Sequence, residues 1–323
     1  MEMRNQTMSP ATPPTAAKLV SSLNGHTDAV ETLAFTADRR LLASGGRDGT
    51  VRIWDIGSSK PGERAIFRKP GEVFRSLAFA PNNRLLAAGS ANGMVSLVDV
   101  SAKAAQEIRV LRGGQASINA LAFSPDGKLV AGGGEDQTLR VWEPGSGPGS
   151  EARILLPGHT LPIKSLMFSP DGQCIATASQ DATARVWSLS RIRASQRFSL
   201  PHGGEVNAVA YTPDGKMLAT AVQGKVIWLW DLTASKPMMR SEYGGHAGGT
   251  RLLLFTPEGE TMVSVGADNK VINWNGRNNK PRHSWELAAA TALCFALTPD
   301  GRYLARGMAD GTVEVYRVAE KRM

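Results

Sequence analysis

Residues 166–189 read LMFSPDGQCIATASQDATARVWSL, and closely related versions of this stretch occur six more times along the chain. The other copies begin at residues 33, 77, 121, 209, 253 and 295. Their matching hydrophobic positions, from Phe35 to Leu297, are separated by 42 to 45 residues. Self-similarity at a fixed period of this length is typical of repeat architectures. The sequence therefore predicts one structural unit repeated seven times.

Each unit is predicted to be a small antiparallel sheet. Its first turn is often Pro-Asp-Gly, at residues 125–127, 170–172, 213–215 and 299–301. Proline presets φ in such turns, and glycine accepts a positive φ. The second turn carries Asp-Gly or a related pair, such as Asp48-Gly49, which is a hairpin signal between β-rich runs. A fourth strand-like run joins successive units, as in ERAIFRK (63–69) and EARILLPG (151–158), so four strands are expected per unit.

The third run of most units is β-branched and ends in a tryptophan, at Trp54, Trp142, Trp187, Trp230 and Trp274. With the repeat length and the turns, this pattern resembles the WD-repeat (WD40) family over residues 17–318. The resemblance implies an all-β, seven-bladed β-propeller of four-stranded antiparallel blades. Physical reasoning agrees, because a lone blade exposes two apolar faces that become buried when blades stack, and closing the ring covers the last two faces.

The expected domain organisation is a flexible tail over residues 1–16, a propeller over 17–318 and a second tail over 319–323. The repeats are expected at about 25–56, 71–100, 114–144, 158–189, 202–232, 245–276 and 288–318. The last unit lacks a fourth strand, whereas AKLVSSLNGH (17–26) matches the fourth-strand pattern. We predict that residues 17–23 pair with the strand at 312–318, which closes the ring with an N-terminal strand and caps an exposed edge.

The net charge of +8, from 37 basic and 29 acidic residues, permits binding to nucleic acid or another polyanion. The basic residues are nevertheless spread along the chain without a block of five, and a solvated surface is the preferred interpretation. Cys174 and Cys294 lie in apolar runs, which argues against a disulfide scaffold and fits a reducing compartment. The chain start has no secretory signal, and no apolar run reaches the length of a membrane span. A cytoplasmic protein without membrane contact is expected.

Histidine, serine and aspartate at His26, Ser44 and Asp48 invite a catalytic interpretation. The resemblance implies another role, in which a His, a Ser or Thr, an Asp and a Trp form a buried hydrogen-bonded chain. Three such tetrads are expected: His26, Ser44, Asp48, Trp54; His159, Thr177, Asp181, Trp187; and His246, Ser264, Asp268, Trp274. Because an active site is rarely installed several times in one domain, a structural role is predicted.

The remaining units depart from the tetrad. In the fifth unit His202, Thr220 and Trp230 are present, but Gln223 stands near the place of the aspartate. The second, third and seventh units lack the set and are expected to be held mainly by packing. Trp228 is expected to pack between blades, and Trp285 is a candidate exposed anchor.

Enzyme motifs are absent from the sequence: it has no phosphate-binding Gly-x-x-x-x-Gly-Lys loop, no His-Glu-x-x-His and no Gly-x-Ser-x-Gly. His283 has no nearby cysteine or second histidine in the sequence, so a zinc site is not expected. We therefore expect no enzymatic activity, no catalytic residue, no cofactor and no metal.

Function in a propeller must be argued from its surface. In the resembling family, partners commonly dock around the central channel, on positions defined relative to each repeat. Carried over, the candidate partner-binding rim comprises Glu31, Arg47, Arg75, Asn119, Glu135, Lys164, Gln180, Glu205, Asn207, Gln223 and Arg251. These residues are polar, and none is aromatic, which favours a protein loop or acidic peptide over an apolar helix.

The sequence thus predicts a non-enzymatic scaffold for protein–protein interaction, a monomeric domain that works within a complex. The alternative is a basic propeller that contacts nucleic acid or another polyanion. A steep dependence of binding on salt would favour the alternative.

Overall fold

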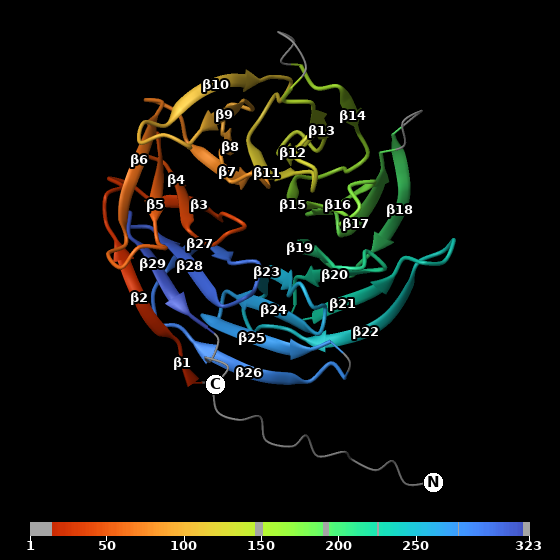
Figure 1. Cartoon of the computed structure of the whole chain (residues 1–323). Coiled ribbons are helices and arrows are strands. Elements are labelled where there is room, and N and C mark those ends of the chain that lie inside the picture. Colours follow the sequence, from red (N-terminus) through yellow and green to blue (C-terminus); the bar gives the residue numbers. More distant parts are fainter. Residues whose placement is uncertain (1–14, 146–150, 190–193, 225, 277, 319–323) are drawn as a thin grey trace, which may run out of the picture.

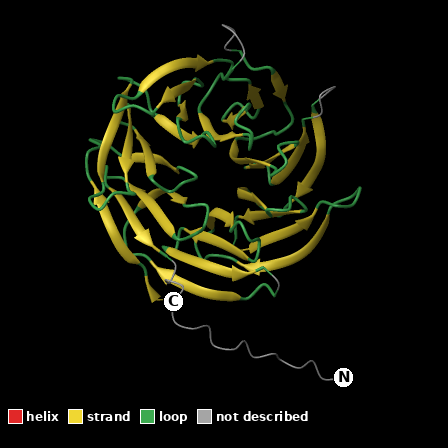
Figure 2. Cartoon of the chain, in the orientation of Figure 1, coloured by secondary structure: helices red, strands yellow, loops and turns green. Residues whose placement is uncertain are grey.

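The computed structural model describes residues 15–145, 151–189, 194–224, 226–276 and 278–318. These residues form strands, turns and loops without a helix, and the strands are arranged as a closed ring of seven blades (Figures 1 and 2). Each blade contains four antiparallel strands, the innermost nearest the centre of the ring, and a short fifth strand is added in parallel to the outer edge of blade 6. This confirms the predicted seven-bladed propeller.

The strands follow the repeats in order. Blades 1 to 4 consist of β3 (Val30–Phe35), β4 (Leu41–Gly46), β5 (Thr50–Asp55), β6 (Gly62–Arg68); β7 (Phe74–Phe79), β8 (Leu85–Ser90), β9 (Val95–Asp99), β10 (Gln106–Leu111); β11 (Ile118–Phe123), β12 (Val130–Gly134), β13 (Leu139–Trp142), β14 (Ile154–Leu156); and β15 (Ile163–Phe168), β16 (Cys174–Ser179), β17 (Thr183–Ser188), β18 (Ser195–Pro201). Blades 5 to 7 consist of β19 (Val206–Tyr211), β20 (Met217–Val222), β21 (Val226–Asp231), β22 (Met238–Gly244); β23 (Thr250–Phe255), β24 (Thr261–Gly266), β25 (Lys270–Asn275), β26 (Pro281–Glu286); and β27 (Ala292–Leu297), β28 (Tyr303–Met308), β29 (Val313–Arg317) with β2 (Lys18–Leu23).

Burial along the strands follows from their place in the blade. The second strand of blade 1, β4, is buried at every residue because neighbouring blades cover both faces of the sheet. The outer strand β18 instead alternates between exposed and buried residues, since one of its faces meets solvent. The second strands are accordingly rich in small apolar residues, as in LLASGG of β4.

Seven hydrophobic clusters form the core, and each one joins two adjacent blades. In the cluster between blades 1 and 2, for example, Ile53 and Phe67 pack with Phe74 and Leu86. No blade can bury its faces alone, so the stability of each sheet depends on its two neighbours.

The N-terminal strand closes the ring as predicted. Strand β2 pairs antiparallel with β29, with Leu19 opposite Tyr316 and Leu23 opposite Val313. Leu23 is buried in the cluster that joins blades 7 and 1. A further short strand, β1 (Thr15–Ala16), pairs in parallel with β26 of blade 6. The predicted tail over residues 1–16 therefore ends in a strand, and its first 14 residues and residues 319–323 lie outside the described residues.

Within the residues that the structure describes, there is no helix with the length and apolarity that a membrane span requires.

Candidate functional site

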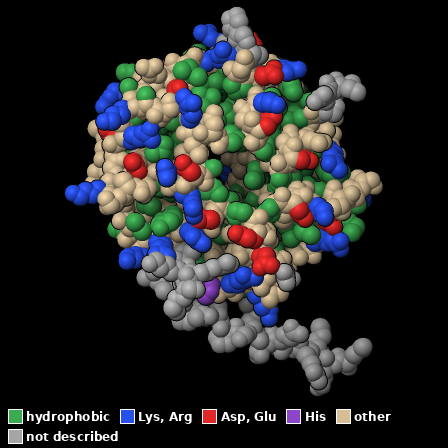
Figure 3. Space-filling view, in the orientation of Figure 1, with side chains coloured by type: hydrophobic (Ala, Val, Ile, Leu, Met, Phe, Trp, Pro, Cys, Tyr) green, Lys and Arg blue, Asp and Glu red, His purple; other side chains and the backbone are tan. Residues whose placement is uncertain are grey.

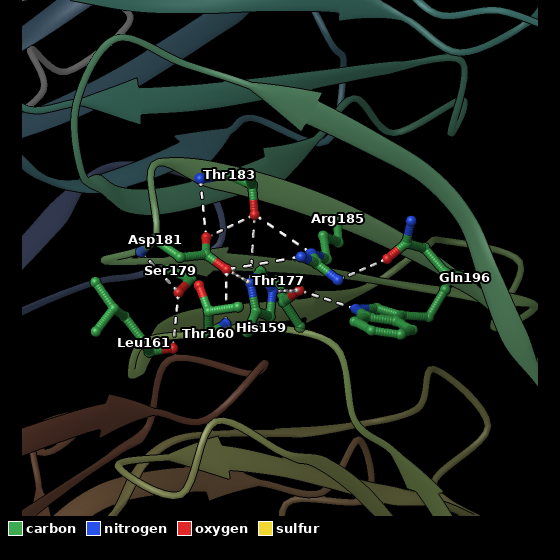
Figure 4. A network of polar contacts seen from close by, with 10 residues as sticks. His159, Thr160, Leu161, Thr177, Ser179, Asp181, Thr183, Arg185 and Gln196 are labelled. Atoms are coloured by element: carbon green, nitrogen blue, oxygen red, sulfur yellow. Dashed lines mark hydrogen bonds and ion pairs between the residues drawn. The ribbon is translucent and has the colours of Figure 1, made fainter.

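The tetrad of blade 4 joins β16 and the turn after it to the loop that precedes β15, the first strand of the blade (Figure 4). His159 Nδ1 lies 2.8 Å from Asp181 Oδ2, and His159 Nε2 lies 2.7 Å from Thr177 Oγ1. The indole N–H of Trp187 donates to the same hydroxyl at 2.9 Å. A carboxylate only accepts, so the imidazole carries its proton on Nδ1, and the Thr177 hydroxyl donates to Nε2 while it accepts from the indole. The chain is thus satisfied at every link.

The tetrads of blades 1 and 6 repeat this geometry. His26 contacts Asp48 and Ser44 at 2.9 and 2.7 Å, and Trp54 donates to Ser44 at 2.8 Å. In blade 6 the corresponding three distances are all 2.8 Å, in the set His246, Asp268, Ser264 and Trp274. The structure therefore brings together all twelve tetrad residues as three separate sets.

The electrostatics of the sets in blades 1 and 4 favour the neutral form of their histidines. Burial lowers the pKa of His26 and His159, although the facing carboxylates act in the opposite direction. The pKa of Asp48 and of Asp181 is also lowered, because hydrogen bonds and the imidazole outweigh the effect of their burial. Each carboxylate also binds the backbone N–H of the residue after the histidine, and so ties two loops together.

The arrangement is unsuited to nucleophilic catalysis. The hydroxyl-bearing residues Ser44, Thr177 and Ser264 are all 0% exposed. A nucleophile must reach its substrate, and these hydroxyls are also occupied by the indole N–H on one side and the imidazole on the other. Within the described residues there is also no group of three histidine, cysteine, aspartate or glutamate side chains that could hold a metal ion.

Blade 5 contains the incomplete tetrad, and the place of its aspartate differs slightly from the prediction. Gly224, four residues after Thr220, occupies the position that Asp181 holds after Thr177, whereas Gln223 precedes it. His202 Nδ1 is consequently buried without a hydrogen-bond partner among the described residues. The ring stacks on Trp228 at 4.9 Å between centroids, and burial lowers the pKa of His202 to about 4.

Blade 7 contradicts the expectation that it is held mainly by packing. Arg306, 1% exposed, occupies the position of the tetrad hydroxyl and donates to Glu314 at 2.6 Å, to the Ala288 carbonyl at 2.7 Å and to the Tyr316 hydroxyl at 2.8 Å. The Tyr316 hydroxyl in turn donates to Glu314 at 2.8 Å. An arginine-centred network therefore replaces the tetrad in this blade.

Blade 3 uses a smaller version of the same solution. The buried Arg140 forms an ion pair with Asp136 at 2.7 Å, and Asp136 also accepts from the backbone N–H of Gln115. In blade 2 the corresponding positions, Ala88 and Val98, lie in a hydrophobic cluster, as expected for a blade held by packing.

Trp285 is buried at 6% exposure and packs between blades 6 and 7, so the prediction of an exposed anchor is wrong. A tryptophan on an outer strand can still point inward, because side chains alternate between the two faces of a strand.

The candidate rim gathers at one end of the central channel. Its members come from the starts of the innermost strands and from the turns between the second and third strands. A depression of about 730 Å³ is lined by nine of the eleven predicted residues: Arg75, Asn119, Glu135, Lys164, Gln180, Glu205, Asn207, Gln223 and Arg251. The loop from Ala247 to Thr250 completes its wall. The face shown in Figure 3 has a hollow at the centre of the ring, with basic and acidic side chains interspersed around it.

Most of the charges on this rim neutralise one another. Glu31, outside the depression, binds Arg47 at 2.5 Å and Arg75 at 3.1 Å. Lys164 forms an ion pair with Glu205 at 2.6 Å and binds Asn207 at 2.9 Å. The contacts of Glu31 with Arg75 and of Lys164 with Glu205 and Asn207 link residues of adjacent blades that are more than 40 positions apart, and no local sequence pattern could have revealed them.

Arg251 is different, because it has no ion pair or side-chain hydrogen bond with any residue that the structure describes. It is exposed at the start of β23 and lines the depression. The amides of Gln180 and Gln223 likewise line the depression and have no side-chain hydrogen bond in the described part of the chain. Counting only the residues that the structure describes, the depression therefore offers one free cation and two free amides to a partner.

The ring of repeated blades and the recurring tetrads define a repeat-built β-propeller. A family model described as "WD domain, G-beta repeat" matches residues 17–55, 65–99, 105–143, 150–188 and 195–231, more than half of the chain. The chain therefore belongs to the WD40 repeat family. The first matched segment runs from β2 to β5, so sequence repeat and blade are offset by one strand.

Individual repeats also resemble curated proteins. The chain is 51% identical over 43 residues to small ribosomal subunit protein RACK1z of Arabidopsis thaliana, which is 13% of each chain. It is 31% identical over 74 residues to the guanine nucleotide-binding protein subunit beta of Nicotiana tabacum, 23% of this chain and 20% of that protein. It is 52% identical over 50 residues to Striatin-4 of Mus musculus, 16% of this chain and 7% of that protein. The matched regions span a fifth or less of the length of these relatives.

Proposed function

We propose that this WD40 propeller is a non-enzymatic interaction scaffold that docks a partner protein or acidic peptide over the rim depression. The observation that carries the proposal is the free guanidinium of Arg251 beside two unengaged amides, in a depression to which several blades contribute. The partial similarity to RACK1z and to a guanine nucleotide-binding protein subunit beta supports a role in protein assembly.

The charge pattern of the rim favours a polar partner over a polyanion. Three of the four rim cations are already paired with rim glutamates, so the depression has little surplus positive charge. A polyanion would need a row of unpaired lysines and arginines to displace its counterions. A single acidic side chain of a protein partner, by contrast, can pair with Arg251, while polar groups of the same partner form hydrogen bonds with the amides of Gln180 and Gln223.

The cytoplasm remains the proposed compartment. Both cysteines are free, and burial raises the pKa of each thiol, which makes them unreactive structural residues.

The experiment is a pull-down from lysate with and without nuclease treatment, measured by quantitative mass spectrometry. It compares wild type with Arg251→Glu and with the matched control Arg282→Glu, an exposed arginine on outer strand β26 of the same blade. We expect a protein enriched by wild type and by the control, and lost with Arg251→Glu. Loss of all enrichment after nuclease treatment would favour a polyanion, and equal enrichment with all three proteins would refute docking at Arg251.

A further inference from the structure

A second hollow lies at the seam between blades 7 and 1, at the strand ends opposite the rim. It has a volume of about 380 Å³ and is bordered by the β3–β4 turn, the β5–β6 loop and strands β2, β28 and β29. Its charged lining residues are Arg39, Arg40, Arg302, Arg317 and Asp38. We propose that this hollow, the seam site, binds the phosphate group of a phosphorylated peptide.

Among the described residues of the seam site, the three guanidiniums of Arg39, Arg40 and Arg302 face two carboxylates, Asp38 and Asp300. Arg40 is exposed and forms no ion pair or side-chain hydrogen bond with a described residue, although it interacts electrostatically with the Asp38 carboxylate. The neighbouring carboxylate of Asp38 is engaged, since it accepts from the Thr36 hydroxyl at 2.7 Å and from the backbone N–H of Arg40 at 3.0 Å. Both bonds go to Oδ1 and hold this acid in its own turn, where its negative charge offsets part of the positive charge of Arg40.

Arg302 is also poorly neutralised. Its side chain is 54% exposed and lies 3.6 Å from Asp300. Asp300 is already bound by Arg39 at 2.5 Å, and it also accepts from the Thr298 hydroxyl. Two guanidiniums from adjacent blades thus share one carboxylate, and Arg40 faces Asp38 without forming an ion pair.

The backbone of Arg39 indicates that its side chain is needed. Arg39 has a φ of 63°, in the left-handed region that favours glycine. The equivalent turn position holds glycine with positive φ in five other blades, at Gly127, Gly172, Gly215, Gly259 and Gly301. Asparagine, which tolerates this region, stands there in blade 2. A long arginine at this position is unfavourable for the turn, so we attribute it to the guanidinium that it delivers to the seam.

The seam between blades 5 and 6 provides an internal comparison. It has a hollow of similar size, about 420 Å³, in the equivalent place. There, Gly259 and Glu260 take the positions of Arg39 and Arg40, and the other charged lining residues are Asp214 and Glu258. Positive charge at the seam between blades 7 and 1 therefore does not follow from the propeller architecture alone.

The chemistry of the seam site favours a phosphate over a carboxylate. A phosphorylated serine or threonine carries about −1.5 to −2 charges at neutral pH and three acceptor oxygens, enough for two guanidiniums at once. A carboxylate has a single charge, so even where it lies between two guanidiniums, as Asp300 does, one positive charge is left over. Arg40 and Arg302, on two different blades, match the larger and more highly charged group.

The surroundings favour a peptide as the source of this phosphate. Val20 is 49% exposed in the wall of the hollow, next to Ile56 and Tyr303, so apolar contacts are available beside the charge. Strand β2 is the outermost strand of blade 7 and, in the described part of the chain, pairs only with β29. An extended peptide can add its backbone to such an edge while its phosphate reaches the arginines.

The test measures fluorescence anisotropy with the full chain and a short fluorescein-labelled alanine–valine peptide that carries one phosphoserine. Matched peptides carry serine or glutamate at the same place. Wild type should bind the phosphopeptide about tenfold more tightly than either control peptide, given the stronger pairing of guanidinium with phosphate. Arg40→Ala/Arg302→Ala should abolish this preference. Arg84→Ala, an exposed arginine in the equivalent turn of blade 2, should preserve it.

Arg39→Gly separates binding from folding. It should weaken binding of the phosphopeptide while the melting temperature stays the same or rises, because glycine suits a φ of 63°. The site lies at the opposite end of the blades from Arg251, so Arg251→Glu should leave phosphopeptide binding unchanged even if the rim proposal fails.

Several results would overturn the assignment. Equal binding of the phosphoserine and glutamate peptides would show a site for any anionic side chain, and equal loss with Arg84→Ala would show an effect of diffuse positive charge. No phosphate-dependent binding by wild type would refute the site outright. A membrane surface would be the ligand instead if wild type failed to bind the peptides but sedimented with phosphatidylserine vesicles, and Arg40→Ala/Arg302→Ala did not sediment.

Discussion

Replacing Arg306 should destabilise the propeller through a network that the WD40 tetrad does not include. The guanidinium is 1% exposed and donates three hydrogen bonds of 2.6 to 2.8 Å. Arg306→Met leaves the Ala288 carbonyl and the Glu314 carboxylate without this donor. Breaking a buried pair costs about 3–5 kcal/mol, and because the Glu314 side chain is 21% exposed and keeps the Tyr316 hydroxyl, we expect about 3 kcal/mol.

Equilibrium urea unfolding, followed by tryptophan fluorescence, measures this loss. Arg282→Met, on exposed outer-strand surface, is the control and should change the free energy of unfolding by less than about 0.5 kcal/mol. The double variant Arg306→Met/Glu314→Gln should recover about 1 kcal/mol relative to Arg306→Met, because it no longer leaves an unpaired charge. If Arg306→Met were as stable as Arg282→Met, the network would not contribute to the free energy of unfolding, and blade 7 would be held mainly by packing.

Three further predictions concern closure, the blade-5 histidine and the tetrads. Deleting residues 1–24 should lower the melting temperature, since it removes β2 and buried Leu23, whereas deleting 1–14 should not; equal melting temperatures would contradict closure by β2. His202 is protonated near pH 6.5 when unfolded but only at about 4 when folded, so it lowers stability as the pH falls through this window. The free energy of unfolding, measured by urea titration, should therefore fall between pH 7 and pH 4 by up to about 3 kcal/mol less in His202→Phe than in wild type. An equal fall in both proteins would count against a neutral buried imidazole. Thr177→Val should cost about 2 kcal/mol in the same assay, because it leaves the Trp187 indole and His159 Nε2 unpartnered; a change under about 0.5 kcal/mol would disprove the structural role of the tetrad hydroxyl.

Much of the fold could be predicted because its signals are local and repeated. Turn residues, strand-like runs and the spacing of the tryptophans recur in each unit, and errors in one unit are corrected by the others. The closing strand was also predictable, since residues 17–23 carry the pattern of a fourth strand that the last unit lacks. The tetrad aspartate precedes the tryptophan by six residues, as Asp181 precedes Trp187. The same spacing before Trp230 would have located Gly224 at the place of the missing aspartate.

Other features depend on side-chain contacts that the repeat does not encode. Arg306 stands where other units have a serine or threonine, so the repeat marked it as a departure without indicating its partners. On the rim, Glu31 pairs with Arg75 of the next blade, and Lys164 with Glu205 of the next. Such pairs are set by the spacing between blades and by side-chain rotamers. The sequence therefore identified rim candidates without showing that Arg251 is the cation left free.

Site-specific photo-crosslinking tests the central claim, that a partner protein docks over the rim, most directly. A benzophenone-bearing residue replaces Gln223 in the rim depression, or Glu242 on outer strand β22 of the same blade as a control. After irradiation in cells and nuclease treatment, the account predicts a discrete crosslinked protein from position 223 that is absent from position 242. Crosslinks to nucleic acid alone, or the same proteins from both positions, would contradict docking at the rim.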